Sequence, residues 1–288
     1  MSQVDRDRSE EPREDARGSL SPAELEELKK ARALLEGGGL VVRVAEALGR
    51  PLEAGLERLP ARARDTIQSV TQTALERALR VALGTMADEP RRSSERLHKA
   101  AAAATGAVGG FFGLGGLTVE LPVATVVMLR SVADIARSEG LDITRPETRL
   151  ACLEVFALGG GGGERAAETG YYAVRAALSQ TLNEAARHIA QHGLSHEGAP
   201  ALVRAVSAVA ARFGIVVEQK VALASVPFLG AVTASVINTL FIDHFQKRAR
   251  GHFLVRRLEA EHGYEVVRAA YEALGPKPGR PPGTGAQM

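Results

Sequence analysis

Apolar residues recur along this chain at the three- and four-residue spacing of helices, and no segment alternates convincingly as a strand would. The clearest pattern lies in the segment 61–83. One helical face of this segment carries Ile67, Val70, Ala74, Ala78 and Val81. Comparable patterns predict further helices over 22–36, 40–48, from about 94, and over 145–158, 165–192, 199–217, 221–242, 243–262 and 264–274. The predicted fold class is therefore all-α, a multi-helix bundle.

Capping and glycine residues mark where several of these helices begin and end. Ser21 and Glu24 have the spacing of a capping box, Pro22 would occupy the first helical position, and Gly37 would end the helix. The run Thr144–Glu147 repeats the same spacing, with a proline at its third position. These signals predict helices that start after Ser21 and after Thr144.

Changes in composition divide the chain into four parts. Residues 1–19 alternate acids and arginines, and residues 275–288 are rich in Pro and Gly, so both are expected to be disordered tails. A break at Gly84–Pro90 separates an N-terminal helical arm, residues 20–88, from the main helical bundle, residues 89–274.

Two long segments of the bundle carry almost no charge. Glu120 is the only charged residue between Lys99 and Arg130, and Val221–Ile242 contains no charged residue. The first segment is also rich in Gly and Ala and contains overlapping GxxxG pairs, a spacing that favours close helix contacts. A membrane-spanning helix needs roughly 20 mainly apolar residues. Two interpretations stay open: central helices buried by their neighbours, or segments that enter a membrane as halves of a hairpin.

Composition and charge change this picture only slightly. The chain is 45% hydrophobic and 24% charged, and 36 basic residues against 34 acidic ones leave a net charge of +2. This balance gives no reason to expect nucleic acid as a partner. The single Cys152 excludes a disulfide framework and any multi-cysteine metal site. We expect no cofactor and no bound metal.

The few polar residues near the apolar segments are candidate site residues. Arg130 and Asp134 are one helical turn apart, and an isolated carboxylate such as Glu120 needs a partner if it is buried. We therefore expect one buried polar network between the apolar helices, made of Glu120, Arg130, Asp134, Glu154 and Asn238. Such a network would fix helix register, or it would line a pocket for a ligand or metal.

The region after the second apolar segment is basic and amphipathic. Its basic residues alternate with large apolar ones and are candidates for contact with anionic lipid head groups. They are Lys247, Arg248, Arg250, Arg256 and Arg257. An ordinary solvated helix face explains the same pattern. Asp243 and His244, at the start of this region, form a second candidate polar site, although adjacent residues point in different directions on a helix.

Several blocks, in a fixed order, resemble the EcsC protein family. They are Phe111–Leu114, Glu120–Pro122, Met128–Ala136, Pro146–Leu150, Leu153–Gly159, Gly170–Arg175, Val226–Val232, Asn238, Asp243–Gln246 and Ala249–Phe253. The resemblance covers roughly residues 90–270 and leaves the arm outside. It implies a bacterial helical protein and brings no biochemical reaction with it.

Three functional hypotheses follow. The first is a membrane-associated, non-enzymatic protein that binds lipid or a membrane protein through residues 100–129 and 221–258. The second is a hydrolase at the membrane surface that uses Glu120, Asp134 and His244. The third is a soluble helical scaffold for partner helices, in which residues 20–85 mediate assembly, for instance into a homo-oligomer. Because Met1–Gly18 lacks the apolar stretch of a secretion signal, we expect a cytoplasmic protein, peripheral to the inner membrane or inserted in it as a hairpin.

Overall fold

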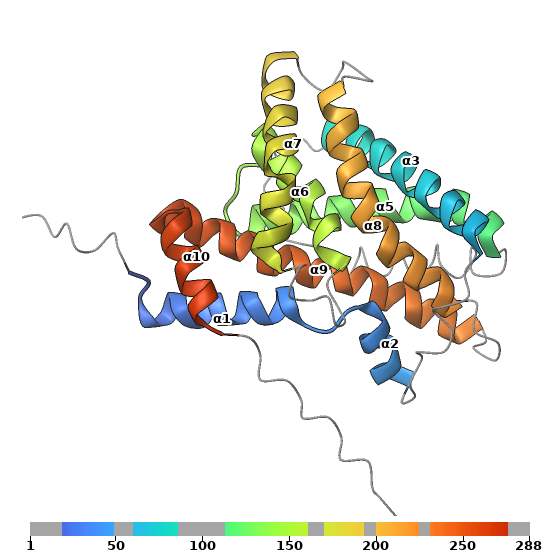
Figure 1. Ribbon diagram of the computed structural model, residues 1–288, viewed down its shortest axis with the longest axis horizontal. Helices are drawn as coiled ribbons and strands as arrows, with labels where there is room; N and C mark the ends of the chain where they lie inside the picture. Colours follow the sequence, from blue (N-terminus) through green and yellow to red (C-terminus); the bar gives the residue numbers. More distant parts are fainter. Residues whose placement is uncertain are drawn as a thin grey trace, which may run out of the picture.

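The structure, a computed structural model, describes residues 19–48, 60–85, 113–160, 170–192, 200–224 and 231–275. In this part of the chain it contains nine α-helices, one short 3-10 helix and no strand (Figure 1). The α-helices are α1 (Pro22–Glu36), α2 (Leu40–Leu48), α3 (Ala61–Thr85), α5 (Gly113–Ser138), α6 (Pro146–Ala157), α7 (Tyr171–His192), α8 (Pro200–Ala224), α9 (Ala231–His262) and α10 (Tyr264–Ala273); the 3-10 helix η3 is Leu158–Gly160. The predicted all-α class is confirmed.

One of the two predicted capping boxes forms. At the start of α1, the Glu24 N–H donates to Ser21 Oγ at 3.3 Å, and the Ser21 N–H donates to Glu24 Oε2 at 2.7 Å. The box predicted at Thr144 is wrong, because α6 follows Arg145, whose side chain makes no capping hydrogen bond. The Thr144 hydroxyl instead donates to Asp142 Oδ1 at 2.6 Å. An aspartate two residues earlier thus takes the hydroxyl that would have capped the helix.

The second apolar segment is divided between two helices. The prediction of one helix over 221–242 is wrong, because α8 extends to Ala224 and α9 begins at Ala231. The prediction of a separate basic helix over 243–262 is wrong as well, because α9 runs on without interruption to His262. A change from apolar to basic side chains is no helix stop signal, whereas the interval between α8 and α9 contains a Pro and a Gly.

Other predicted segments lie partly outside the described residues. Of the first apolar segment, the structure describes α5 from Gly113, and the preceding residues 100–112 fall outside it. Nearly all of the two predicted tails, residues 1–18 and 276–288, also fall outside. The helix predicted from residue 165 is described only from Tyr171.

Helix α9 is the central element of the fold. It contacts α1, α2, α5, α6, α8 and α10. In Figure 1, it crosses the molecule, with α1 running along one side of it. Helix α3 packs against α5 and α8, while α6 and α7 pack against each other and against α8. The segment predicted as an N-terminal arm is therefore built into the bundle, since α1, α2 and α3 all contact its body.

A cluster of phenylalanines holds the middle of the bundle together. Phe156 of α6 packs edge-on against Phe213 of α8 at 4.9 Å between ring centroids, and both contact Phe245 of α9. Gly159 makes room for this cluster, because a Cβ at this position would lie 2.6 Å from the Phe245 ring. Aromatic pairs at such distances stabilise a core beyond the area that they bury.

Candidate functional site

The described parts of the two apolar segments meet where α5, α8 and α9 come together. We define the apolar end as the start of α5 (Gly113–Thr125), the last residues of α8 (Lys220–Ala224) and the start of α9 (Ala231–Phe241). The Lys220 ammonium lies 2.6 Å from Glu120 Oε1 and 4.9 Å from the centre of the Phe241 ring, so it joins all three helices. Glu120 therefore has its neutralising partner on α8, in a nearly buried ion pair.

The polar network predicted from the sequence does not form as one unit. Asp134 pairs with Arg137, whose Nη1 lies 3.2 Å from Asp134 Oδ1, and Arg130 is exposed on α5. Glu154 lies in a different cluster, described below. Asn238 is buried in α9. Glu120 and Arg130 are ten residues apart on α5, roughly 15 Å along the helix axis, which is too far for a direct contact.

Asp243 and His244 point to different neighbours. Asp243 forms an ion pair with Arg43 of α2, and Lys247 lies 3.2 Å from the same carboxylate. His244 Nε2 donates to the carbonyl oxygen of Gly159 at 2.9 Å. Burial, together with the charge of Arg248, lowers the pKa of His244 to about 3. A histidine that stays neutral and donates to a backbone carbonyl has an architectural role here.

Arg248 corrects the lipid-contact prediction most clearly. It was expected on an exposed basic face, but it is 1% exposed. Its guanidinium donates to the carbonyl oxygens of Leu34 at 3.3 Å and Gly37 at 2.9 Å. These are carbonyls at the end of α1, which a helix leaves without partners of its own. The physical reason for the error is the cover that α1 provides, and the sequence pattern of α9 alone cannot reveal it.

The other predicted lipid-contact residues lie in mixed surroundings. Arg257 pairs with Glu27 of α1 at 2.9 Å and lies 3.5 Å from Glu139. Arg256 faces the interior, 4.0 Å from the Glu154 carboxylate. Lys247 and Arg250 are exposed. Carboxylates of the same chain thus face part of the basic charge of α9, which makes this helix a poor match for anionic head groups.

A cluster of tyrosines, absent from the predicted site residues, lies where α7, α9 and α10 meet. Arg175 forms a two-pronged ion pair with Glu259, at 2.6 and 2.9 Å, and Tyr172 donates to the same carboxylate at 3.0 Å. The Arg175 guanidinium also faces the rings of Tyr171 and Tyr264. A sequence signal existed in the one-turn spacing of Tyr171 and Arg175, but Glu259 is too distant along the chain to be paired with them by spacing.

The inner side of this cluster contains the most buried of the described histidines. His252 is completely buried, and its Nδ1 lies 3.1 Å from the Tyr171 hydroxyl. Burial is the main cause that lowers the pKa of His252 well below its usual value, with smaller effects from Arg256 and Arg175. The Glu154 carboxyl lies 3.6 Å from His252 Nε2, and burial raises the pKa of Glu154. The cluster therefore holds a neutral histidine against an acid whose neutral form is favoured.

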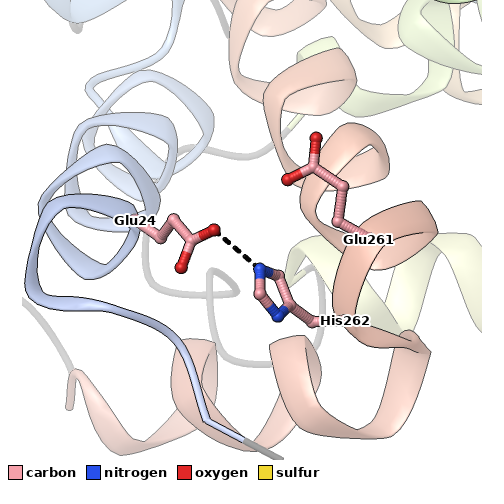
Figure 2. A group of neighbouring side chains, drawn as sticks. All are labelled: Glu24, Glu261 and His262. Atoms are coloured by element: carbon pink, nitrogen blue, oxygen red, sulfur yellow. Dashed lines mark hydrogen bonds and ion pairs between the residues drawn. The ribbon is translucent and has the colours of Figure 1, made fainter. Parts of the chain in front are cut away.

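A group near the surface could hold a metal ion. Glu24, Glu261 and His262 each offer one ligand atom, and these atoms lie within 4.8 Å of one another (Figure 2). His262 Nε2 lies 2.7 Å from Glu24 Oε1, and hydrogen bonds from Ser21 and His262 lower the pKa of Glu24 to about 2. Glu261 lies 3.7 Å from Arg257. A metal ion would have to displace these contacts, which already fasten α1 to the end of α9.

The hydrolase hypothesis required Glu120, Asp134 and His244 around one metal or water. Their described partners are Lys220, Arg137 and the Gly159 carbonyl, on different helices of the bundle. The structure therefore does not bring these three side chains into one site.

Among the described residues, one helix is long and apolar enough to cross a membrane. It is α8, with a mean hydropathy of 1.6 over an 18-residue window, half of which is buried. The core helix of a soluble bundle can have the same length and composition. The segment 221–242, which the sequence singles out, shares only Val221–Ala224 with α8.

These features define an all-α bundle with one apolar end and a buried tyrosine cluster. The chain belongs to the EcsC protein family, which matches residues 24–258. The match begins in α1 and so includes most of the segment 20–88, which the sequence analysis places outside the resemblance. No curated protein and no solved structure matches the chain.

Proposed function

We propose that this EcsC-family protein is a non-enzymatic, membrane-associated bundle that contacts lipid, or the apolar surface of a membrane protein, through its apolar end. One observation carries the proposal. Val119 and Val123 lie one helical turn apart on α5, and they are 69% and 40% exposed. They flank Glu120, whose charge is neutralised by Lys220.

The charge distribution at this end favours contact with an apolar phase. Within the three ranges of the apolar end, Glu120 and Lys220 are the only charged residues. The Lys220 ammonium and the Glu120 carboxylate are 2.6 Å apart. Removing such an ion pair from water costs far less free energy than removing an isolated charge. The apolar end can therefore approach hydrocarbon without leaving an unpaired charge there.

We place the protein at the surface of the inner membrane, on its cytoplasmic side. Full insertion of α8 would have to break its contacts with α3, α6 and α7, and half of its apolar window is buried inside the protein. Insertion of a few exposed valines breaks none of these contacts. Each fully buried valine contributes roughly 1.5–3 kcal/mol, which is sufficient for reversible binding when several act together.

Vesicle co-sedimentation tests this proposal. The double variant Val119→Asp/Val123→Asp should reduce the bound fraction at least tenfold, because it replaces apolar contacts with charges at the interface. The control is Val203→Asp, which makes the same change at a site that is also 40% exposed. Val203 lies about 25 Å along α8 from Lys220, so its variant should bind as the wild type does.

Two results would contradict the proposal. One is a wild-type protein that stays in the supernatant with both zwitterionic and anionic vesicles. The other is an equal loss of binding in the α5 double variant and in Val203→Asp. Helical circular dichroism of every variant, compared with the wild type, separates a loss of contact from a loss of fold.

A further inference from the structure

Two nitrogen donors face the Glu154 carboxyl group without reaching it. His252 Nε2 lies 3.6 Å from Glu154 Oε2, and Arg256 Nη2 lies 4.0 Å from the same oxygen. Both distances exceed the length of a hydrogen bond. Among the described residues, no donor lies within hydrogen-bond distance of this carboxyl group.

The donors themselves are also without partners in the described part of the chain. His252 Nε2 is a buried atom with no hydrogen bond, and so is Arg256 Nε, which belongs to the same guanidinium as the Nη2 that faces Glu154. Nearly all buried polar groups in folded proteins do have a partner, which is often a ligand or an ordered water. Two orphaned donors beside a buried acid with no donor of its own therefore point to a missing group.

The neighbouring hydrogen bonds decide which His252 nitrogen carries the proton. Arg175 Nη1 donates to the Tyr171 oxygen at 3.2 Å, so the hydroxyl hydrogen of Tyr171 is directed to its other neighbour, His252 Nδ1, at 3.1 Å. A neutral imidazole has one N–H, and with Nδ1 accepting, that N–H is at Nε2. The site thus presents an N–H from His252 and N–H groups from Arg256.

A single oxygen atom can bridge the acid and each of the two donors. Partners that are 3.6 and 4.0 Å apart can each lie about 2.9 Å from one shared atom, with an angle of roughly 80–90° at that atom. Such an oxygen would accept from His252 and from Arg256. Glu154 would be its third neighbour, and a protonated carboxyl would donate to it.

We propose that Glu154, His252 and Arg256 form a binding site for a small carboxylate. Two N–H donors face one buried carboxyl group at distances that a shared ligand oxygen would bridge, and Arg256 supplies the opposite charge. Arginine and carboxylate groups also match in shape, because both are planar and pair through two hydrogen bonds. A ligand would reach the site past the Arg256 side chain, because Arg256 is 27% exposed and His252 is completely buried.

The site should bind its ligand more tightly at lower pH, because Glu154 must be protonated to donate. Burial already raises the pKa of Glu154. The other groups that act on it are Arg256 and Glu259 of α9 and Arg175 of α7, besides the neutral His252. A bound carboxylate adds a further negative charge and favours the protonated acid more strongly. Above the pKa of Glu154, binding should weaken about tenfold per pH unit.

The intrinsic fluorescence of the protein is a local probe of this site. The chain has no Trp and four Tyr. Tyr171 contacts His252, Tyr172 and Tyr271, and Tyr172 contacts Tyr264. All the tyrosine fluorescence of the protein therefore comes from the cluster that adjoins the site.

Titration of the wild-type protein with sodium acetate, against sodium chloride at equal ionic strength, tests the proposal. Acetate should change the tyrosine emission with saturation, and more weakly at pH 8 than at pH 6. A parallel titration with octanoate distinguishes the source of the carboxylate. Much tighter binding of octanoate indicates a lipid acyl chain, and equal binding indicates a small free acid. No saturable effect of either anion would overturn the proposal and leave a bound water as the missing group.

Three variants make the test specific. Arg256→Gln should weaken acetate binding about tenfold or more, because it removes a charged donor. Arg257→Gln is the matched control, since Arg257 is 30% exposed and pairs with Glu27, so acetate affinity should stay within about twofold. Glu154→Gln keeps a donor without needing a proton, so acetate should still bind, without the pH dependence. Equal effects of both arginine variants, or a pH dependence that persists in Glu154→Gln, would contradict the proposal.

Discussion

Gly251 of α9 lies close against the backbone of α1. A Cβ here would lie 2.7 Å from Leu35 Cγ and 2.8 Å from the Ala31 carbonyl oxygen, so the backbone of α1 would have to move. Gly214 of α8 differs, because its Cβ would meet mainly the end of the Gln68 side chain, at 2.6 Å. A flexible side chain can move aside at little cost, whereas a helix backbone cannot.

This contrast gives a paired prediction. Gly251→Ala should lower the free energy of unfolding by about 1–3 kcal/mol, because overpacking outweighs the better helix propensity of Ala. Gly214→Ala should leave it unchanged or raise it by up to about 1 kcal/mol. Urea denaturation measures both variants. Equal stability of the two would show that α1 does not press against α9 at Gly251.

The buried His244 makes stability depend on pH. Its pKa is lowered to about 3 in the folded state, so the unfolded chain binds the proton more readily. The stabilising effect is complete above the usual histidine pKa of about 6.5 and is lost as the pH falls toward 3. Between pH 7 and pH 5, His244 should account for a loss of about 2 kcal/mol.

Replacement of His244 isolates this contribution. His244→Gln keeps a donor for the Gly159 carbonyl and cannot be protonated, so its loss of stability between pH 7 and pH 5 should be about 2 kcal/mol smaller than that of the wild type. His192→Gln, at the exposed end of α7, is the control and should match the wild type. Urea denaturation at the two pH values measures the difference, and identical losses in all three proteins would contradict the account.

At the scale of single residues, the sequence predicted charges that need partners but not the partners themselves. Glu120 stands alone in an apolar stretch, which indicates that it needs a counter-charge if it is buried. Lys220, one hundred residues later, provides this charge. Arg248 had the periodicity of a surface residue, yet α1 covers it. Local periodicity reports which face of a helix a residue occupies, and tertiary packing decides what lies against that face.

At the scale of elements, α1 joins the bundle through both its apolar and its polar side chains. Leu28 and Ala31 are completely buried, and Glu27 and Glu24 contact the end of α9. Its start was predictable because the capping box is a local signal. Its docking was not, because nothing within α1 specifies α9 as a partner. On the sequence alone, the helix boundaries of the segment 221–242 are placed at its charged ends. Pro and Gly are stronger helix breakers than a change in charge, and they lie between α8 and α9.

Because α1 belongs to the same folded unit as the tyrosine cluster, a destabilising substitution in α1 should also make the cluster unfold more easily. Leu28→Ala should lower the free energy of unfolding, measured by tyrosine fluorescence, by about 2–5 kcal/mol, because it leaves a cavity in the core. Lys30→Ala, at an exposed position of the same helix, should change it by no more than about 0.5 kcal/mol. If α1 were an independent arm, tyrosine unfolding would be the same in Leu28→Ala and in the wild type.

At the scale of the whole molecule, the bundle separates two kinds of chemistry. The apolar end gathers the segments that the sequence marked as poor in charge, and the tyrosine cluster gathers polar groups around α7, α9 and α10. The all-α class was predictable because helical periodicity runs through the whole chain. The tyrosine cluster was not, because its members come from distant parts of the sequence and none stands out by composition.

The most direct test of the proposed membrane contact is a fluorescent label at its centre. Cys152 is buried and its pKa is raised to about 12 by burial, so it should resist labelling. Val123→Cys and Val203→Cys can therefore each carry an environment-sensitive dye at positions of equal exposure. Added vesicles should shift the emission of the dye at position 123 to shorter wavelength and leave that at position 203 unchanged. No shift at position 123, or equal shifts at both positions, would contradict the account.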